Sequence, residues 1–131
     1  MLEQINPELV CRILAGAREF QAKEEVVLPD VPDNPSEDWA LQALANHTDD
    51  LTFSEIKDAI DDLEQDQQAA LVALMWLGRG DFSAEEWEDA LSEAAGRWTP
   101  RTAEYLLATP LVADYLEEGL SQLGYSCETQ Y

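Results

Sequence analysis

The chain has 131 residues, of which 7 are Lys or Arg and 28 are Asp or Glu, giving a formal net charge of −21 at pH 7. This charge repels nucleic acid and anionic lipid, so we expect neither direct nucleic-acid binding nor membrane association. With 46% hydrophobic residues the chain can form a core, and its length predicts a single domain over residues 1–131.

The expected helices follow from prolines, capping residues and the spacing of apolar residues. Proline is favoured at the first helical position because the N–H that it lacks would have no partner there. We expect helices over roughly residues 7–23, 35–46, 52–63, 66–77, 83–95, 100–108 and 110–123. Residues 26–34, which contain two prolines, predict an extended linker, and residues 124–131 predict a short polar tail.

Two of these helix starts carry a capping box, in which a cap side chain and a glutamate three residues later each bond the other's backbone N–H. One box pairs Thr52 with Glu55, and the other pairs Ser83 with Glu86. Both boxes predict where a helix begins.

An unbroken apolar run extends from Ala69 to Leu77. A segment that is apolar on every side must lie in the middle of a protein, and its Ala, Leu and Met residues favour a helix over a buried strand. We therefore predict an all-α bundle of about six to seven helices around a buried central helix, residues 66–77.

Glycines have two predicted roles: they end helices, as we also expect of Gly96 and Gly124, and they let neighbouring helices approach closely. Gly78 and Gly80 predict a turn after the central helix. Gly16 and Gly119 fall inside expected helices, where glycine costs about 1 kcal/mol relative to alanine. Close approach of a neighbouring helix is the reason we expect for both.

The cysteines and the N-terminal residues indicate the cellular compartment that we expect for the protein. Cys11 and Cys127 lie near opposite ends of the chain and form neither a disulfide framework nor a metal motif, so we expect two reduced thiols. No basic segment followed by a long apolar run opens the sequence, and no apolar run reaches the length of a membrane span. We expect a cytoplasmic protein.

Two motifs carry a resemblance to a known family. They are M-W-L-G-R-G-D at residues 75–81 and T-P-L at 109–111 leading to D-Y-L-E-E-G at 114–119. With their surroundings, residues 67–124, they resemble a bacterial family called domain of unknown function 3775. The resemblance implies a bacterial, cytoplasmic protein and no particular activity.

Four carboxylates, those of Glu55, Asp58, Asp61 and Asp62, gather on the expected helix 52–63 as candidate ligands for a divalent metal. Such a charge run is usually a solvated helix face, and both interpretations stay open. His47 is the one histidine of the chain, which excludes a multi-histidine metal site, and no nucleophile motif accompanies it. We therefore predict no catalytic residue and no cofactor.

Arg79, flanked by glycines, lies just before an expected helix start and could hold a phosphate there. Asp81 and the acidic residues after it oppose a further anion. The other interpretation is an ion pair, either with these carboxylates or with a second acidic group on the last helix. The candidate interaction residues are therefore Arg79, Asp81, Asp114, Glu117 and Glu118.

Most aromatic side chains fall at core positions of the expected helices, and any that are exposed together would mark a binding patch. The residues concerned are Trp39, Trp76, Trp87, Trp98, Tyr105 and Tyr115.

The acidic residues are concentrated between Glu24 and Asp66. This range contains 14 carboxylates and a single basic residue, Lys57. Such a density favours either plain solubility or a surface that docks a basic partner. Our leading hypothesis is a regulatory or adaptor-like interaction module that docks the basic surface of an unidentified protein. The alternatives are a carboxylate-based metal-binding protein or hydrolase, and a homodimeric structural module.

Overall fold

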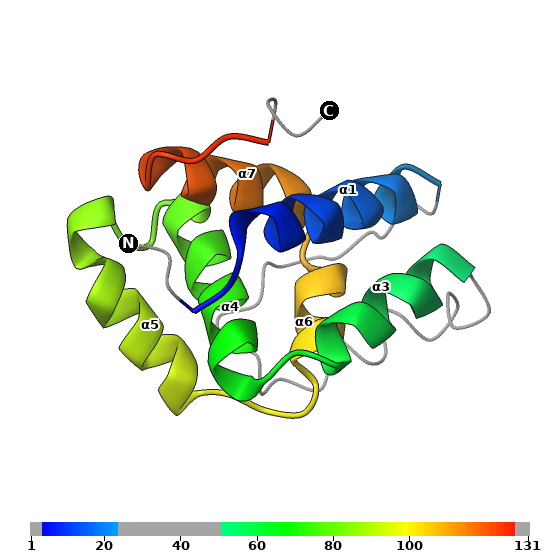
Figure 1. Ribbon diagram of the computed structural model, residues 1–131, viewed down its shortest axis with the longest axis horizontal. Helices are drawn as coiled ribbons and strands as arrows, with labels where there is room; N and C mark the ends of the chain where they lie inside the picture. Colours follow the sequence, from blue (N-terminus) through cyan, green and yellow to red (C-terminus); the bar gives the residue numbers. More distant parts are fainter. Residues whose placement is uncertain (1–3, 24–50, 128–131) are drawn as a thin grey trace.

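The computed structural model describes residues 4–23 and 51–127 (Figure 1). Across these ranges all regular secondary structure is helical, which confirms the all-α prediction. The α-helices are α1 (Pro7–Lys23), α3 (Leu51–Asp61), α4 (Gln65–Arg79), α5 (Trp87–Gly96), α6 (Thr102–Ala108) and α7 (Val112–Gln122), and a 3-10 turn, η2 (Ala84–Glu86), precedes α5. The expected helix 35–46, the linker 26–34, Trp39 and His47 lie outside the described residues.

α4 lies at the centre of the bundle, with α5 on one side, α6 on the other, and α7 across its C-terminal half (Figure 1). Ten consecutive residues of α4, from Gln68 to Leu77, are buried. Each fully buried Leu or Met side chain contributes about 1.5–3 kcal/mol by leaving water. The prediction of a buried central helix is therefore confirmed, although the helix runs two residues further than expected, to Arg79.

Glycines set the distance between α4 and α7. A Cβ added to Gly78 would overlap the carbonyl oxygen of Tyr115, and one added to Gly119 would overlap that of Leu74. A Cβ at Gly16 would meet the side chain of Ile56 on α3. The predicted close approach at Gly16 and Gly119 is thus confirmed.

The prediction that Gly78 takes part in the turn after the central helix is wrong. It lies inside the last turn of α4, where its missing side chain admits α7. Gly80 alone makes the left-handed turn, with φ of 97°, and its N–H bonds the carbonyls at the end of α4.

The Ser83 capping box is confirmed, since Glu86 Oε1 accepts a hydrogen bond of 2.8 Å from Ser83 N–H. It caps the short η2 turn that leads directly into α5. The Thr52 box is wrong as a helix start, because α3 already includes Leu51 and Thr52 is therefore inside the helix.

A capping box that the sequence analysis missed opens α4. Gln67 Oε1 accepts a hydrogen bond of 2.9 Å from Glu64 N–H, and the Glu64 side chain accepts one from Gln67 N–H. Glutamate is not among the preferred N-cap residues, so the sequence pattern does not predict a helix start here.

Candidate functional site

Three of the candidate interaction residues, Asp114, Glu117 and Glu118, lie together on the solvent side of α7. The opposite side of this helix is buried and includes Val112, Leu116 and Leu120. Positions 114, 117, 118 and 121 are three, four and seven residues apart, so they share one helix face. With Ser121, Tyr125 and Ser126, the three carboxylates line a pocket of about 440 Å³. We call it the α7 pocket.

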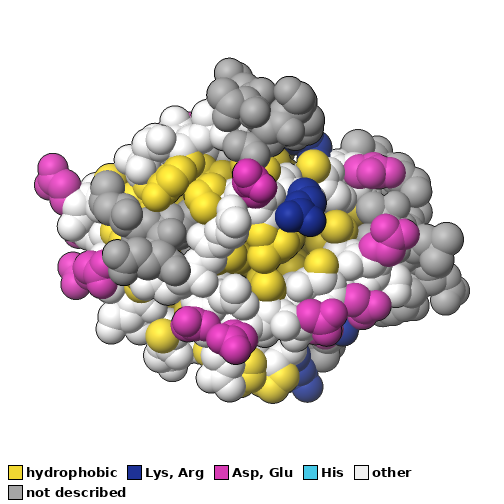
Figure 2. Space-filling model, viewed as in Figure 1, with side chains coloured by type: hydrophobic (Ala, Val, Ile, Leu, Met, Phe, Trp, Pro, Cys, Tyr) yellow, Lys and Arg dark blue, Asp and Glu magenta, His cyan; other side chains and the backbone are white. Residues whose placement is uncertain are grey.

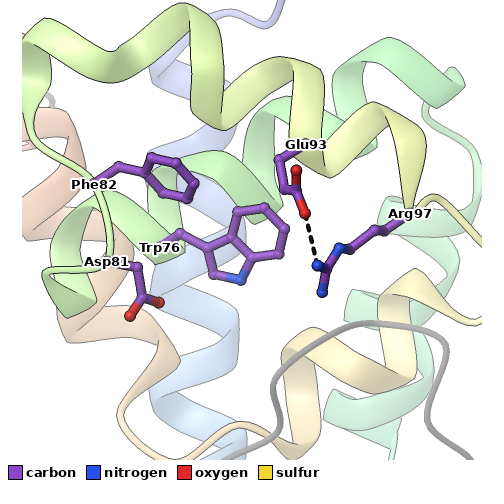
Figure 3. A pocket seen from close by; sticks show the side chains of 5 residues that line it. All are labelled: Trp76, Asp81, Phe82, Glu93 and Arg97. Carbon is purple, nitrogen blue, oxygen red and sulfur yellow. Dashed lines mark ion pairs between the residues drawn. The ribbon is translucent and has the colours of Figure 1, made fainter.

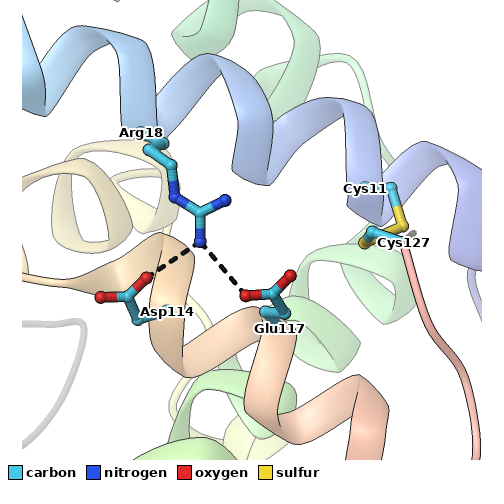
Figure 4. Close-up of polar contacts among 5 residues, drawn as sticks. All are labelled: Cys11, Arg18, Asp114, Glu117 and Cys127. Carbon is cyan, nitrogen blue, oxygen red and sulfur yellow. Dashed lines mark hydrogen bonds and ion pairs between the residues drawn. A yellow bond between two sulfur atoms is a disulfide. The ribbon is translucent and has the colours of Figure 1, made fainter. Parts of the chain in front are cut away.

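Arg18 reaches the edge of this pocket from α1, which lies beside α7 (Figures 1 and 4). Its Nη2 atom is 2.9 Å from Asp114 Oδ1 and 3.4 Å from Glu117 Oε1. The hydrogen bond to Asp114, together with the neighbouring Glu117 charge, raises the pKa of Arg18. All three side chains are about half exposed, so each pair contributes no more than about 1 kcal/mol to stability.

Arg18 was not among the candidates from the sequence. It lies 96 residues from Asp114, and nothing in its local sequence identifies its partner. Its position shows that a guanidinium fits between two of the α7 carboxylates.

Arg79 and Asp81, the other two candidates, form an ion pair at the end of α4. Arg79 Nε donates to Asp81 Oδ2 at 2.7 Å, and Nη2 lies 2.6 Å from the same oxygen. The side chain of Arg79 is only 16% exposed. The structure therefore supports the interpretation in which Arg79 forms an ion pair with a neighbouring carboxylate, that of Asp81.

Asp81 also lines a second, smaller pocket of about 230 Å³ with Trp76, Phe82, Glu93 and Arg97 (Figure 3). The rings of Trp76 and Phe82 are stacked, with centroids 5.9 Å apart. Arg97 Nη2 lies 2.7 Å from Glu93 Oε2. Both carboxylates here are paired with an arginine, so this pocket has no excess of negative charge.

The candidate metal ligands Glu55, Asp58, Asp61 and Asp62 lie on or just after α3. Lys57 Nζ is 2.6 Å from Asp61 Oδ2, so one of the four already has a cationic partner. Among the described residues, no group of three or more His, Cys, Asp and Glu side chains is arranged to hold a metal ion. The geometry of this region therefore gives the metal hypothesis no support.

Cys11 and Cys127 form a disulfide, with their Cα atoms 5.6 Å apart (Figure 4). The expectation of two reduced thiols is therefore corrected. The fold places α7 along α1 and returns the segment after α7 to the first half of α1. A separation of 116 residues conceals this proximity in the sequence.

The aromatic residues behave largely as predicted. Trp76, Trp87 and Tyr105 are buried, and Trp76 Nε1 donates a hydrogen bond of 3.0 Å to Tyr105 Oη. Burial raises the pKa of Tyr105. Within the described ranges the only exposed large hydrophobic side chain is Leu111, so the aromatics form no surface patch there.

Figure 2 shows one face of the molecule, on which hydrophobic side chains lie between scattered charged ones. On the face shown in Figure 2, Asp and Glu side chains are spread around the rim, and Lys and Arg are few. No helix among the described residues is both long enough and apolar enough to cross a membrane.

The sequence profile of a family described as "Protein of unknown function (DUF3775)" matches residues 53–125. The matched segment includes the three carboxylates of the α7 pocket but neither Arg18 nor the two cysteines. A search of curated proteins and a search of solved structures each found no match.

Proposed function

The chain belongs to the DUF3775 family, whose description names no activity, and we propose on structural grounds that it is a regulatory or adaptor-like interaction module. Its α7 pocket docks a basic segment of a partner protein. In keeping with the family resemblance, we place the protein in the bacterial cytoplasm.

The observation that carries the proposal is the composition of the α7 pocket. Three carboxylates line it, whereas Arg18 supplies one positive charge at its edge. The formal balance is 1 − 3 = −2, which leaves negative charge for a second cationic group. Arg18 pairs with Asp114 and Glu117, whereas Glu118 accepts a hydrogen bond of 3.3 Å from Gln122 Nε2.

The geometry suits an arginine of the partner. Arg18 already bridges two carboxylates one helical turn apart, and charge-assisted bonds of this kind are stronger than neutral ones. Tyr125, which also lines the pocket, is an aromatic residue of the kind that a guanidinium can contact.

The overall charge of the protein supports the same function. A net charge of −21 attracts basic surfaces over distances of about one Debye length, roughly 8–10 Å at physiological salt, and speeds their encounter. Long-range attraction alone would not select one face. In this proposal the selection comes from the α7 pocket.

A labelled oligoarginine peptide tests the proposal by fluorescence anisotropy. We expect binding that weakens steeply with salt and that falls about tenfold in the double variant Asp114→Asn/Glu118→Gln. The matched control, Asp58→Asn/Asp62→Asn on the α3 side, removes the same charge and should cost less than about threefold. Equal losses in the two double variants would contradict a specific site.

A further inference from the structure

The disulfide and the α7 pocket meet at the end of the described chain. Tyr125 and Ser126 line the pocket, and the next residue is Cys127, which is bonded to Cys11 on α1. Figure 4 shows the segment that carries Cys127 running beside α7 to reach α1. One wall of the pocket therefore ends in a covalent link.

A turn at the end of α7 starts this segment. Gly124 adopts a φ of 92°, and Tyr125 N–H donates a hydrogen bond of 2.9 Å to the carbonyl of Leu120. The turn directs the chain back along the helix, and the disulfide fixes the far end of the segment. Between these two points lie only Tyr125 and Ser126, so both residues are held in place from either side.

We infer that the Cys11–Cys127 pair is a thiol–disulfide switch that shapes the α7 pocket. In the oxidised protein the segment is fastened and the pocket is complete. In the reduced protein the covalent link at the far end of the segment is gone, and the wall formed by Tyr125 and Ser126 is held by its non-covalent contacts alone, so it is held less firmly. The switch rests on the proposed function in one respect: it regulates docking only if the pocket is the docking site.

The reaction needs a dithiol reductant, which supplies two electrons and two protons. Its thiolate attacks one cysteine sulfur, the S–S bond between Cys11 and Cys127 breaks, and a mixed disulfide forms. The second thiol of the reductant then resolves the mixed disulfide, which leaves two cysteine thiols and an oxidised reductant. Cys11 and Cys127 are 5% and 4% exposed, so attack requires a local opening of the segment.

The switch favours docking in the oxidised state. When the wall of the pocket is already ordered, binding does not have to immobilise its side chains. The conformational entropy saved at one side chain raises the affinity about two- to tenfold. In a reducing cytoplasm the pocket would be open and weaker, and oxidation would complete it.

The first measurement of the test needs no partner. Hydrogen exchange of the full chain is followed with and without dithiothreitol, and we expect the protection of the Tyr125 amide to fall about tenfold on reduction, while the amides of α5 stay unchanged. The variant Cys11→Ser/Cys127→Ser should match the reduced protein and ignore the reductant. Equal protection of Tyr125 in the oxidised and reduced proteins, or free thiols in the protein purified without reductant and exposed to air, would overturn the switch.

The second measurement separates the switch from docking. We expect the oligoarginine peptide to bind the oxidised protein about two- to tenfold more tightly than the reduced one. Equal affinity for both forms would overturn redox control of docking and leave the proposed function standing. Binding to neither form, with Tyr125 released on reduction, would remove the proposed function and leave the switch in place.

Discussion

Gly78 of α4 and Tyr115 of α7 meet so closely that a single added Cβ at Gly78 would overlap the Tyr115 carbonyl oxygen. Backbone therefore packs on backbone at this crossing. The contact fixes how α7 lies on α4, and with it which side of α7 faces solvent. This packing leaves the three carboxylates of the α7 pocket on the solvent side of the helix.

We expect Gly78→Ala to lower the free energy of unfolding by about 3 kcal/mol, because the neighbour is backbone and cannot move aside as a side chain does. Denaturant unfolding measures the change. The matched control is Gly96→Ala at the end of α5, where a Cβ meets nothing within 4 Å and should be neutral or stabilising by up to about 1 kcal/mol. A neutral Gly78→Ala would mean that the helices are further apart than described.

Leu111 has a left-handed backbone, with φ of 62°, and its side chain is 57% exposed. A leucine is strained in this conformation, and glycine is not. Leu111→Gly should therefore raise the free energy of unfolding by about 0.5–1 kcal/mol in thermal unfolding, despite the greater freedom of glycine in the unfolded chain. Leu111→Ala keeps the Cβ and should bring no gain. A destabilised glycine variant would show that the side chain makes a contact the strain argument omits.

Gln68 is a buried polar residue with partners on both sides of its amide. Its Nε2 donates to the carbonyl of Ile60 at 2.8 Å, and its Oε1 accepts from Trp98 Nε1 at 2.6 Å. Gln68→Met should cost about 2–3 kcal/mol of stability, because two polar groups lose their partner. Trp98 fluorescence and denaturant unfolding report the loss together. Gln65→Met, at the exposed start of α4, serves as control, and an equal effect at both positions would refute the account.

The disulfide closes a loop that spans most of the chain. Because Cys11 and Cys127 are 116 residues apart, the bond restricts the unfolded chain strongly, and we expect it to contribute about 2–4 kcal/mol. Cys127→Ser should lower the midpoint of thermal unfolding accordingly. Adding reductant should lower the midpoint of the parent protein and leave that of the variant unchanged. A parent protein indifferent to reductant would contradict a stabilising disulfide.

Local signals in the sequence located most of the described helices. Pro7 set the start of α1, the apolar run set α4, and Ser83 with Glu86 set the entry to α5, because capping and periodicity are properties of adjacent residues. Thr52 failed as a start since the helix already includes Leu51, and a capping pattern cannot exclude a helix that begins earlier.

The candidate site was predictable only in part. The shared face of Asp114, Glu117 and Glu118 follows from helical spacing. Arg18 and the bond between Cys11 and Cys127 depend on α1 and α7 lying side by side, and no local pattern encodes that packing. Nor does any local pattern specify the Tyr125 wall, because it exists only where the chain turns back after Gly124.

The central claim is that basic segments dock in the α7 pocket, and amide chemical-shift mapping of the oxidised protein during titration with the oligoarginine peptide tests it most directly. We predict that the largest shifts fall on Asp114 to Ser121, on Arg18 and on Tyr125, and that they disappear in Asp114→Asn/Glu118→Gln. Shifts spread evenly over the acidic surface, or centred on the smaller pocket lined by Trp76 and Phe82, would contradict the claim.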